Sequence, residues 1–312
     1  VKEEDGSFKK IVEQSEADEK TALIKEVNSG MYIFDTPLLI KMLAFLKPQG
    51  AKKEYYLTDT LGLLKENGKK VEVYKAEDFT EAMGINSKKQ LAQAAAIMRA
   101  KTNDDFMAAG VTIIHPEVTY IDATVKIGAD SVIYPNSHIQ GATVIGKNCV
   151  IGPDCWIENS KIEDGAVIKS GSYITDSTVG KKCQVGPYAH LRPSAVLKEG
   201  AKVGNYVEIK KAVIGKGSKV SHLTYIGDTE MGSGVNVGAG TITCNYDGVN
   251  KYKTVIGDDV FVGSNTNFVA PVKIGRGAKI GAGSTVTEDI PAGELAIARA
   301  RQVNLNRKKG NK

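Results

Sequence analysis

An aliphatic residue returns at every sixth position across more than half of the chain, from Ile121 to Val286. The period slips by one residue at a few places and then resumes. The later members of the series are Ile127, Ile133, Ile139, Ile145, Ile151, Ile157, Ile162, Ile168, Ile174, Val179, Val185, Leu191, Leu197, Val203, Ile209, Ile214, Val220, Ile226, Ile256, Val262, Phe268, Ile274 and Ile280. A fixed short period is typical of a solenoid. The pattern therefore predicts a mainly β fold, a parallel β-helix with one aliphatic side chain per repeat in a narrow core.

Small residues recur four positions after many of these aliphatics, where a corner of the coil leaves little room. They are Ser131, Ser137, Thr143, Cys149, Cys155, Ala166, Ser172, Cys183 and Ala195. Glycine also follows the aliphatic directly, as at Gly128 and Gly146. We expect these glycines to supply backbone angles that other residues adopt rarely.

The first 80 residues show a different pattern, in which helical and strand-like stretches alternate. Residues 31–34 and 71–74 are β-like runs, while 38–46 and 55–65 carry apolar residues at helical spacing. This alternation predicts a partial α/β region.

A helix is expected between this region and the solenoid. Ser87 and Gln90 form a capping box at its start, and Gly110 follows its end near Ala109. Three apolar residues share one face of the helix: Leu91, Ala95 and Met98. The expected organisation is a partial pyrophosphorylase-like domain over 1–86, a linker helix over 87–110, the β-helix over 111–290 and a tail over 291–312.

Composition narrows the function less than the repeat does. Hydrophobic residues make up 42% of the chain and charged residues 25%, as in an ordinary soluble protein. The net charge of +5 is too small to argue for nucleic acid but suits phosphorylated small molecules. We find no apolar run that could span a membrane, no secretory signal and no metal-ligand spacing. Three of the four cysteines occupy the small-residue position, which is a packing role. Because no export signal is visible, reduced thiols in the cytoplasm are expected.

The hexapeptide pattern resembles the hexapeptide acyltransferases, whose β-helix is left-handed and has three flat faces. The left hand comes from the resemblance alone, since parallel crossovers generally favour the right hand. Three hexapeptides per coil place stacked positions 18 residues apart, less any slips.

The N-terminal stretches resemble the end of a sugar-nucleotide pyrophosphorylase domain. The matching segments are Ile11-Val12-Glu13, Glu26-Val27-Asn28-Ser29-Gly30, Glu54-Tyr55-Tyr56-Leu57-Thr58-Asp59 and Gly84-Ile85-Asn86. In this order, with the solenoid, they resemble the family of bifunctional N-acetylglucosamine-1-phosphate uridyltransferases/glucosamine-1-phosphate N-acetyltransferases. The resemblance implies that Glu13 and Asn28 contact the sugar nucleotide and that Asn86 contacts the nucleotide and its Mg²⁺.

The family's uridyltransferase site also needs a Gly-x-Gly-Thr-Arg-Met loop and an upstream Asp, which this sequence does not contain. Backbone amides of such a loop cradle phosphates. We therefore expect this chain not to use UTP productively.

Alternation along the predicted strands places several charged side chains outside the solenoid. Arg192 and Lys210 lie 18 residues apart with no slip between them, so they should stack on adjacent coils. Glu208 and Tyr225 lie 17 apart with one slip and should stack as well. A solvated charged face is the simpler interpretation of such charges. The stacking instead predicts two cations for a phosphate, with a carboxylate and a phenol for sugar hydroxyls or an amine.

His222 is the candidate base near this patch. Amide formation from an amine and a thioester needs a group that takes the amine's proton, and histidine titrates in the useful range. A surface or structural role is the alternative for a single histidine. The family resemblance makes His222 the catalytic base and makes Arg192, Lys210, Tyr225 and Asn236 contacts to the amino-sugar phosphate.

The repeat is interrupted once, by the polar, glycine-containing residues 238–251, which we expect to form a projecting loop. The resemblance implies that Asn245 and Tyr246 line the acceptor and CoA region and that Lys251 reaches a neighbouring subunit. It further implies acetyl-CoA contacts from Ala239, Ser264, Ala282 and, at the phosphate, Arg299. Backbone amides over 238–240 are candidates for stabilising the developing oxyanion. A homotrimer with sites between subunits is the arrangement of the family.

The leading hypothesis is acetyl transfer from acetyl-CoA to the amine of glucosamine-1-phosphate. In full-length members of the family the product is then uridylylated to UDP-N-acetylglucosamine for the bacterial envelope. One alternative is a non-catalytic trimeric scaffold. Another is a metal-dependent hexapeptide-repeat carbonic anhydrase, which needs three histidines on adjacent coils, whereas His190 and His222 lie too far apart to be its close pair.

Overall fold

The computed structural model describes residues 1–13, 17–48 and 53–305. The chain forms two compact units, Val1–Ala95 and Ala96–Lys312. Within the described residues, no helix is both long enough and apolar enough to cross a bilayer. The basic residues Arg307, Lys308 and Lys309 lie outside the described part.

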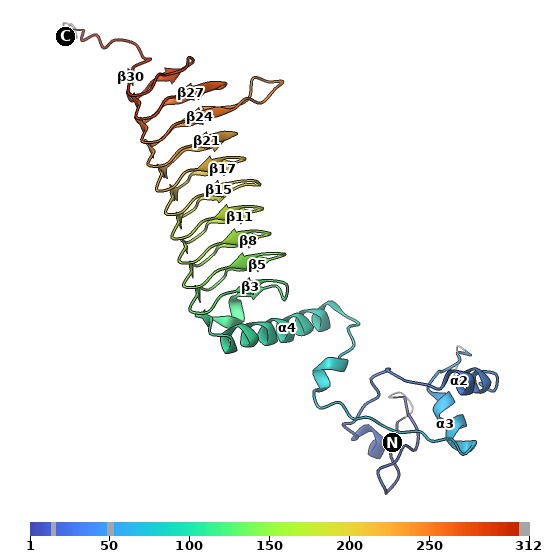
Figure 1. Cartoon of the computed structure of the whole chain (residues 1–312). Coiled ribbons are helices and arrows are strands. Elements are labelled where there is room, and N and C mark those ends of the chain that lie inside the picture. Colours follow the sequence, from blue (N-terminus) through green and yellow to red (C-terminus); the bar gives the residue numbers. More distant parts are fainter. Residues whose placement is uncertain (14–16, 49–52, 306–312) are drawn as a thin grey trace, which may run out of the picture. The chain divides into compact units, whose positions relative to one another are not determined.

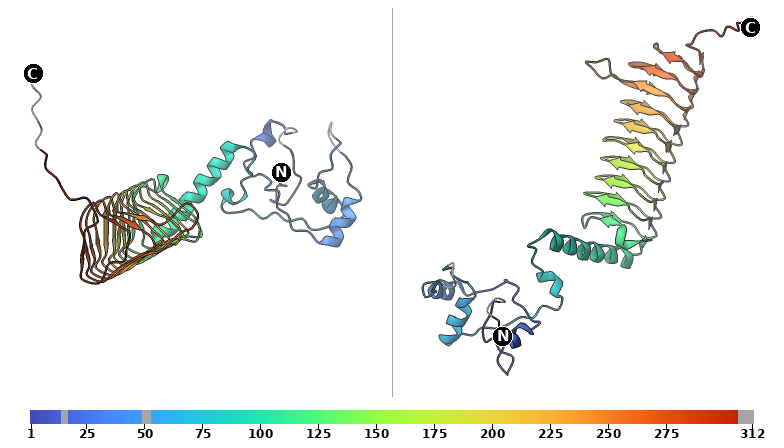
Figure 2. Two further views of the ribbon diagram at one scale, coloured as in Figure 1. Left: turned by 90° about the horizontal axis from the view of Figure 1, so that it is seen from above. Right: turned by 180° about the vertical axis from the view of Figure 1, so that it is seen from behind.

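The second unit is a solenoid of three parallel sheets, which we call the first, second and third faces (Figure 1). The first face contains β1 (Thr112–Ile113), β4 (Val132–Ile133), β7 (Val150–Ile151), β10 (Val167–Ile168), β13 (Gln184–Val185), β16 (Lys202–Asn205), β19 (Lys219–His222), β22 (Asn236–Val237), β25 (Phe261–Val262), β28 (Lys279–Ile280) and β30 (Leu295–Ala296). The second contains β2 (Tyr120–Ile121), β5 (His138–Gln140), β8 (Trp156–Glu158), β11 (Tyr173–Thr175), β14 (His190–Leu191), β17 (Glu208–Lys210), β20 (Tyr225–Gly227), β23 (Ile242–Cys244), β26 (Asn267–Val269) and β29 (Thr285–Val286). The third contains β3 (Lys126–Ile127), β6 (Val144–Ile145), β9 (Lys161–Ile162), β12 (Thr178–Val179), β15 (Val196–Leu197), β18 (Val213–Ile214), β21 (Thr229–Met231), β24 (Thr254–Ile256) and β27 (Val272–Ile274). Viewed nearly end-on, the coils enclose a prism (Figure 2, left).

The predicted repeat is confirmed by the core. The inward aliphatics from Ile133 to Ile280 are buried on all three faces and form one continuous cluster. The small residues at the corners are buried as predicted, and some bind the next coil: Ser131 Oγ donates to Gly146 O at 2.8 Å. Burial also raises the pKa of the Cys155 and Cys183 thiols to about 11, so these cysteines are inert packing groups.

The glycines after the aliphatics have a different role from the predicted one. None of Gly128, Gly146 and Gly152 has a positive φ; instead, an added Cβ at Gly128 would lie 2.7 Å from the carbonyl carbon of Gly146 in the next coil. The left-handed backbone falls at the corners between faces. There Asn, Asp and Gly predominate, because they tolerate a positive φ.

The second face carries a ladder of stacked rings over its first coils, formed by Tyr120, His138, Trp156 and Tyr173. Successive ring centroids lie 4.5, 5.1 and 5.8 Å apart, with interplanar angles of 20° or less. The guanidinium of Arg99 lies 5.0 Å from the Tyr120 ring centre. Stacked aromatic rings attract one another, as a guanidinium and an aromatic ring do, so the ladder stabilises the stack of coils.

Helix α4 (Lys88–Ala108) confirms the predicted helix and both of its ends. Gln90 N donates to Ser87 Oγ, and the Gln90 side chain accepts from Asn86 N. After the helix, Gly110 has φ +90° and the N–H of Val111 donates to Phe106 O, which is a Schellman cap. The predicted apolar stripe is not buried, since Leu91 and Met98 are exposed; Asn103 is buried instead, with Phe106 and Met107 against the solenoid core.

The first unit contains the short helices α1 (Glu19–Ala22), α2 (Thr36–Leu43), η2 (Phe79–Ala82) and α3 (Asp59–Glu66). The strands expected over 31–34 and 71–74 are wrong, because both stretches are irregular in the structure. A strand needs a paired neighbour, and neither 31–34 nor 71–74 pairs with another described stretch of this unit. Met31 and Ile33 are consequently exposed.

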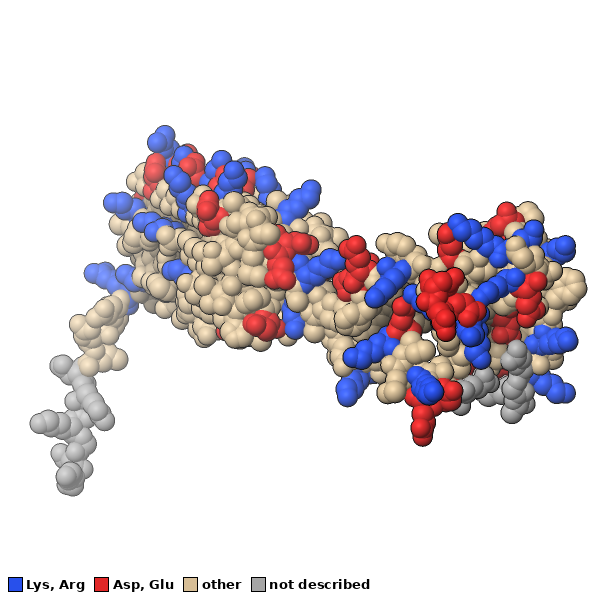
Figure 3. Space-filling model, turned by 90° about the horizontal axis from the view of Figure 1, so that it is seen from below, with Lys and Arg blue, Asp and Glu red and all other residues tan. Residues whose placement is uncertain are grey.

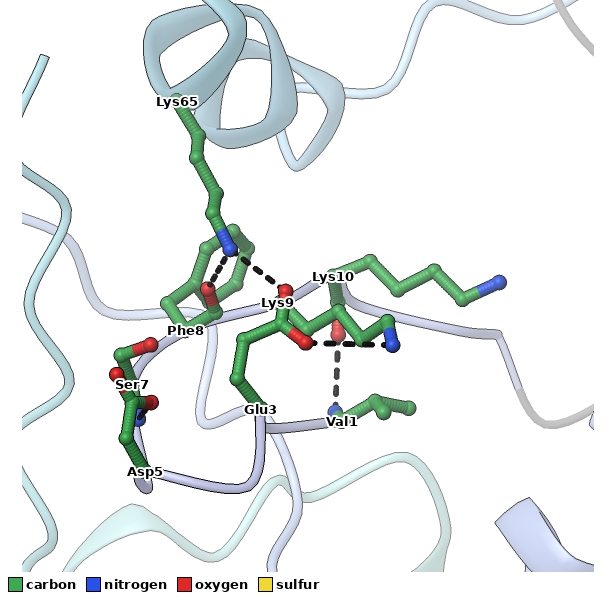
Figure 4. A network of polar contacts seen from close by, with 8 residues as sticks. All are labelled: Val1, Glu3, Asp5, Ser7, Phe8, Lys9, Lys10 and Lys65. Carbon is green, nitrogen blue, oxygen red and sulfur yellow. Dashed lines mark hydrogen bonds and ion pairs between the residues drawn. The ribbon is translucent and has the colours of Figure 1, made fainter. Parts of the chain in front are cut away.

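A polar network ties the start of the chain to α3 (Figure 4). Lys65 Nζ donates to Glu3 Oε1 at 2.9 Å and to Phe8 O at 2.7 Å, and Lys9 pairs with the same carboxylate. These two ammonium groups lower the pKa of Glu3. The network is exposed, so it contributes little to stability.

Candidate functional site

The first edge, which we define as the row of corners joining the first face to the second, brings together the predicted base and the predicted acetyl-CoA contacts. His222 ends β19 and is exposed. Its carbonyl accepts a hydrogen bond from Gly240 N at 3.3 Å, and Ala239 O accepts one from Asn265 N at 2.7 Å. Because each corner bonds to the preceding one, the row is rigid.

The same row continues towards the C-terminus. Ser264 O accepts from Gly283 N at 2.8 Å, and Ala282 O accepts from Arg299 Nη1 at 2.6 Å. His222, Ala239, Ser264, Ala282 and Arg299 therefore follow one another along a single edge, on successive coils. An elongated ligand could contact all five.

Two of the backbone amides predicted to stabilise an oxyanion are already engaged. Gly238 N donates to Val262 O at 2.9 Å and Gly240 N donates to His222 O. No hydrogen bond from Ala239 N is recorded within the described residues. Gly238 has a packing role, since an added Cβ would lie 2.5 Å from Ser264 N.

Four of the predicted sugar-phosphate residues lie on the second face, and its register confirms their stacking: Arg192, Glu208, Lys210 and Tyr225. Glu208 pairs with Tyr225, and the pair Leu191↔Ile209 puts Arg192 and Lys210 at the next position along their strands. Arg192, however, already has an anionic partner within the chain. Its Nη1 donates to Glu208 Oε1 at 2.7 Å, from one coil to the next.

Lys210 is left beside other cations. Lys251 first, and Arg192 second, lower the pKa of Lys210 by repulsion, while Asp228 opposes them weakly. Lys251 comes from the projecting hairpin of residues 245–253, so it reaches this face within its own chain. Adjacent ammonium groups favour an anion between them.

The projecting hairpin begins later than predicted. Ile242–Cys244 forms β23, so the chain leaves the prism only after Cys244 (Figure 1). The repeat was hidden because its inward position is Thr243, whose Oγ1 accepts from Gly227 N at 2.7 Å. Asn245 is buried and donates through Nδ2 to Asp228 Oδ2, which fixes the base of the hairpin.

Tyr246 is exposed in this hairpin, where it pairs with Lys251 in an antiparallel bridge. Next to them is a shallow hollow of about 190 Å³. Its lining is Lys211, Asp228, Lys251, Tyr252 and Lys253. The sequence pointed to Lys251 but not to Asp228 or Lys211, whose signal would have been their position at corners next to Lys210.

Asn236 is not brought to the second face. It lies on the first face, in register with Lys219 and Phe261. A ligand on the second face of one chain therefore lacks the contact predicted from Asn236 of that chain.

The predicted nucleotide residues lie in the first unit and at the start of α4. Asn28 Nδ2 donates to Tyr32 Oη at 2.6 Å, Asn86 N donates to Gln90, and Glu13 is exposed. No hydrogen bond joins any two of the three within the described ranges. Nor do those ranges contain a group of three or more His, Cys, Asp or Glu that could hold a metal ion.

The stacked coils define the class of protein, a solenoid of hexapeptide repeats with three parallel sheets. Residues 253–288 match the family model of bacterial transferase hexapeptide repeats, and residues 108–209 match that of the EIF2B subunit epsilon LbH domain. The chain belongs to the GlmU family. It is 51% identical over 304 residues to the bifunctional protein GlmU of Exiguobacterium sp. strain AT1b, covering 97% of this chain and 67% of that protein.

A second relative, GlmU of Carboxydothermus hydrogenoformans, is 52% identical over 299 residues, with 96% of this chain and 67% of the relative covered. The chain thus spans about two thirds of the length of these relatives. The solved Francisella novicida UDP-N-acetylglucosamine acyltransferase is 16% identical with a TM-score of 0.45, over 60% of this chain and 67% of that one. The left-handed sense of the coil follows from the family.

Proposed function

We propose that the solenoid transfers an acetyl group from acetyl-CoA to the amine of glucosamine-1-phosphate. The observation that carries the proposal is the position of His222. It lies at the corner between β19 on the first face and β20 on the second, at one end of the row that leads to Arg299 and three residues before Tyr225. One base is thereby within reach of two different substrates.

In the proposed reaction, acetyl-CoA lies along the first edge with a phosphate at Arg299 and its thioester at His222. Contacts come from Ala239, Ser264 and Ala282, and from Asn245 and Tyr246 near the acceptor. His222 takes a proton as the amine attacks the carbonyl carbon, and the C–S bond then breaks to release the thiol. Of the candidate amides, Ala239 N is the one free to donate to the oxyanion.

The sugar phosphate occupies the second face. Lys210 and Lys251 provide a pair of cations that repel each other, and Asp228 offsets the repulsion only weakly, which supports a phosphate there. Glu208 is held by Arg192 and stacks with Tyr225, so these groups face the sugar rather than the phosphate. Arg192 then orients Glu208 as well as adding charge.

Asn236 supports a homotrimer with sites between subunits. Since it lies on a different face from Lys210, Asn236 of a second copy is the one that would contact the same sugar. Lys251 was expected to reach a neighbouring subunit; in the proposed site it instead contributes to the second face of its own chain. The scaffold alternative leaves the Lys210–Lys251 pair unexplained.

No uridylyl-transfer step is proposed for the described residues. Asn86 alone offers one amide oxygen to Mg²⁺, and the residues present do not complete an oxygen-ligand site for that ion. His190 lies on the second face and His222 ends a strand of the first face, so the two do not form the close histidine pair that the carbonic anhydrase alternative needs. The four thiols are free, which fits a cytoplasmic enzyme. Figure 3 shows charges of both signs interspersed, with no single basic surface for nucleic acid on the side in view.

The test is thiol release from acetyl-CoA with glucosamine-1-phosphate, compared with glucosamine at the same concentration. We expect turnover with the phosphorylated sugar and at least tenfold less with glucosamine, because the latter gains nothing from Lys210 and Lys251. No thiol release with either sugar would reject the proposal.

A further inference from the structure

Three neighbouring corners of the first edge carry large apolar side chains where the backbone is left-handed. They are Tyr188 (φ 51°), Tyr206 (φ 53°) and Leu223 (φ 48°). Bulky residues rarely adopt this conformation. The other non-glycine left-handed corners in the described solenoid are all polar: Asp130, Asn136, Asn148, Asp154, Asn159, Asp176, Lys182, Ser194, Lys211, Asp228, Asp259 and Asn265.

These three side chains form what we call the apolar ledge. The rings of Tyr188 and Tyr206 are stacked with centroids 5.5 Å apart and planes 13° from parallel. The Tyr188 ring closes the ledge at one end, since a Cβ on Gly171 would lie 2.5 Å from it. Tyr206 is 59% exposed and Leu223 is 63% exposed, so the ledge is open to a ligand. Strained backbone of this kind persists mainly at binding and catalytic sites.

The position of the ledge indicates what it binds. Leu223 directly follows His222 in the chain. Tyr206 occupies the same corner on the preceding coil, so Leu223 lies between Tyr206 and Ala239 along the edge. A thioester that runs from Arg299 along the edge, with its carbonyl carbon at His222, directs the rest of its acyl group onto Leu223 and Tyr206. Those side chains are apolar, as an acyl chain is.

We infer that the apolar ledge is an acyl subsite, which makes short acyl-CoA thioesters, and not acetyl-CoA alone, the donor class. This inference rests on the proposed function. In each transfer the amine nitrogen bonds to the acyl carbon, the C–S bond breaks, and the amine's proton passes through His222 to the departing thiolate. Each methylene covered by the ledge is expected to improve kcat/KM about fourfold relative to an open edge.

The experiment compares acetyl-, propionyl- and butyryl-CoA as donors to glucosamine-1-phosphate, in the wild-type chain and in Tyr206→Asn. Asparagine suits the left-handed corner, as Asn136 and Asn265 show on the same edge, so the variant should fold. We expect kcat/KM for acetyl-CoA to stay within about twofold. The value for butyryl-CoA should fall about tenfold. Tyr134→Asn, several coils away, is the matched control and should change neither.

Two results would overturn the inference: an unchanged preference between butyryl- and acetyl-CoA in Tyr206→Asn, or an equal loss with both donors. An equal loss accompanied by a smaller particle in light scattering would assign the ledge to a contact between copies. Calorimetric binding of the two thioesters provides an independent readout. If the wild-type chain binds both but transfers no acetyl group, the proposed function fails, while the affinity ratio in Tyr206→Asn still decides the ledge.

Discussion

The two halves of the second face have the same backbone and opposite outward chemistry. Over the first coils, the rings of Tyr120, His138, Trp156 and Tyr173 stack on one another and need no further partner. Over the later coils, Lys210 lies beside Lys251 and its pKa is lowered by the repulsion. Aromatic rings that attract one another complete the scaffold, whereas ammonium groups that repel one another favour a ligand of opposite charge between them.

This contrast separates structural from functional residues on one uniform sheet. The inward residues are equivalent in both halves, as Ile157 and Ile209 are both fully buried. Substitutions in the cation half should therefore affect substrates and spare the fold, and substitutions in the ring half should do the reverse.

The largest expected effect is that of His222→Ala. The variant should lose about 10²- to 10⁴-fold in turnover, because nothing else at this edge replaces the base. Calorimetry should show that acetyl-CoA and glucosamine-1-phosphate still bind. Normal turnover at saturating substrate would remove His222 from the mechanism.

Lys210→Ala should raise KM for glucosamine-1-phosphate about ten- to a hundredfold and leave KM for acetyl-CoA unchanged, because a charge-assisted bond to the phosphate is lost. Arg192→Ala should raise the same KM and additionally lower kcat, since Glu208 loses the guanidinium that holds it. If either variant weakened acetyl-CoA instead, the phosphate would be assigned to the wrong face.

A smaller effect is expected from pH. Lys210 has a lowered pKa, so it loses its charge at a lower pH than an ordinary lysine, and KM for the sugar phosphate should begin to rise there. Lys251→Ala removes the first cause of the shift, so the rise should move to higher pH, although the KM at neutral pH is somewhat poorer. The sign for stability is the reverse: within that window the unfolded chain binds more protons, so the free energy of unfolding increases with pH. An unshifted KM profile in Lys251→Ala would contradict the contact.

The smallest effect on catalysis is expected from Trp156→Ala, in the ring half. Both KM values and kcat should stay within about twofold of wild type. The free energy of unfolding should decrease by about 3 kcal/mol, because the aromatic packing and two ring contacts are lost. Thermal denaturation measures this, and a large loss of activity in a folded variant would end the contrast between the two halves.

The sequence was sufficient for the solenoid because each coil is specified locally. The 17-residue step from Glu208 to Tyr225 could be counted from the aliphatic period and is the observed register. The same count missed the coil through Thr243. A polar residue takes the inward position there, and its hydroxyl is hydrogen-bonded to the backbone of Gly227.

The aliphatic period could not predict which of several neighbouring side chains an exposed residue would contact. Alternation placed Arg192 next to Lys210, but the flexible guanidinium reaches diagonally to Glu208. In the first unit, the β-like run through Ile33 required a partner strand that periodicity cannot supply. The roles of Glu13, Asn28 and Asn86 remain predictions of the resemblance.

The stacking of corners along the first edge has a consequence for how the molecule fails. Each coil is held chiefly by the coils before and after it, so a solenoid opens from its ends inward under mild heat or denaturant. The N-terminal end of the solenoid is covered by Phe106 and Met107, whereas Arg299 lies beyond β30, the last strand of the described residues. Fraying would therefore detach Arg299 from Ala282 while the coil of His222 remained folded. Such a chain would bind acetyl-CoA progressively more weakly at temperatures well below its cooperative melting point.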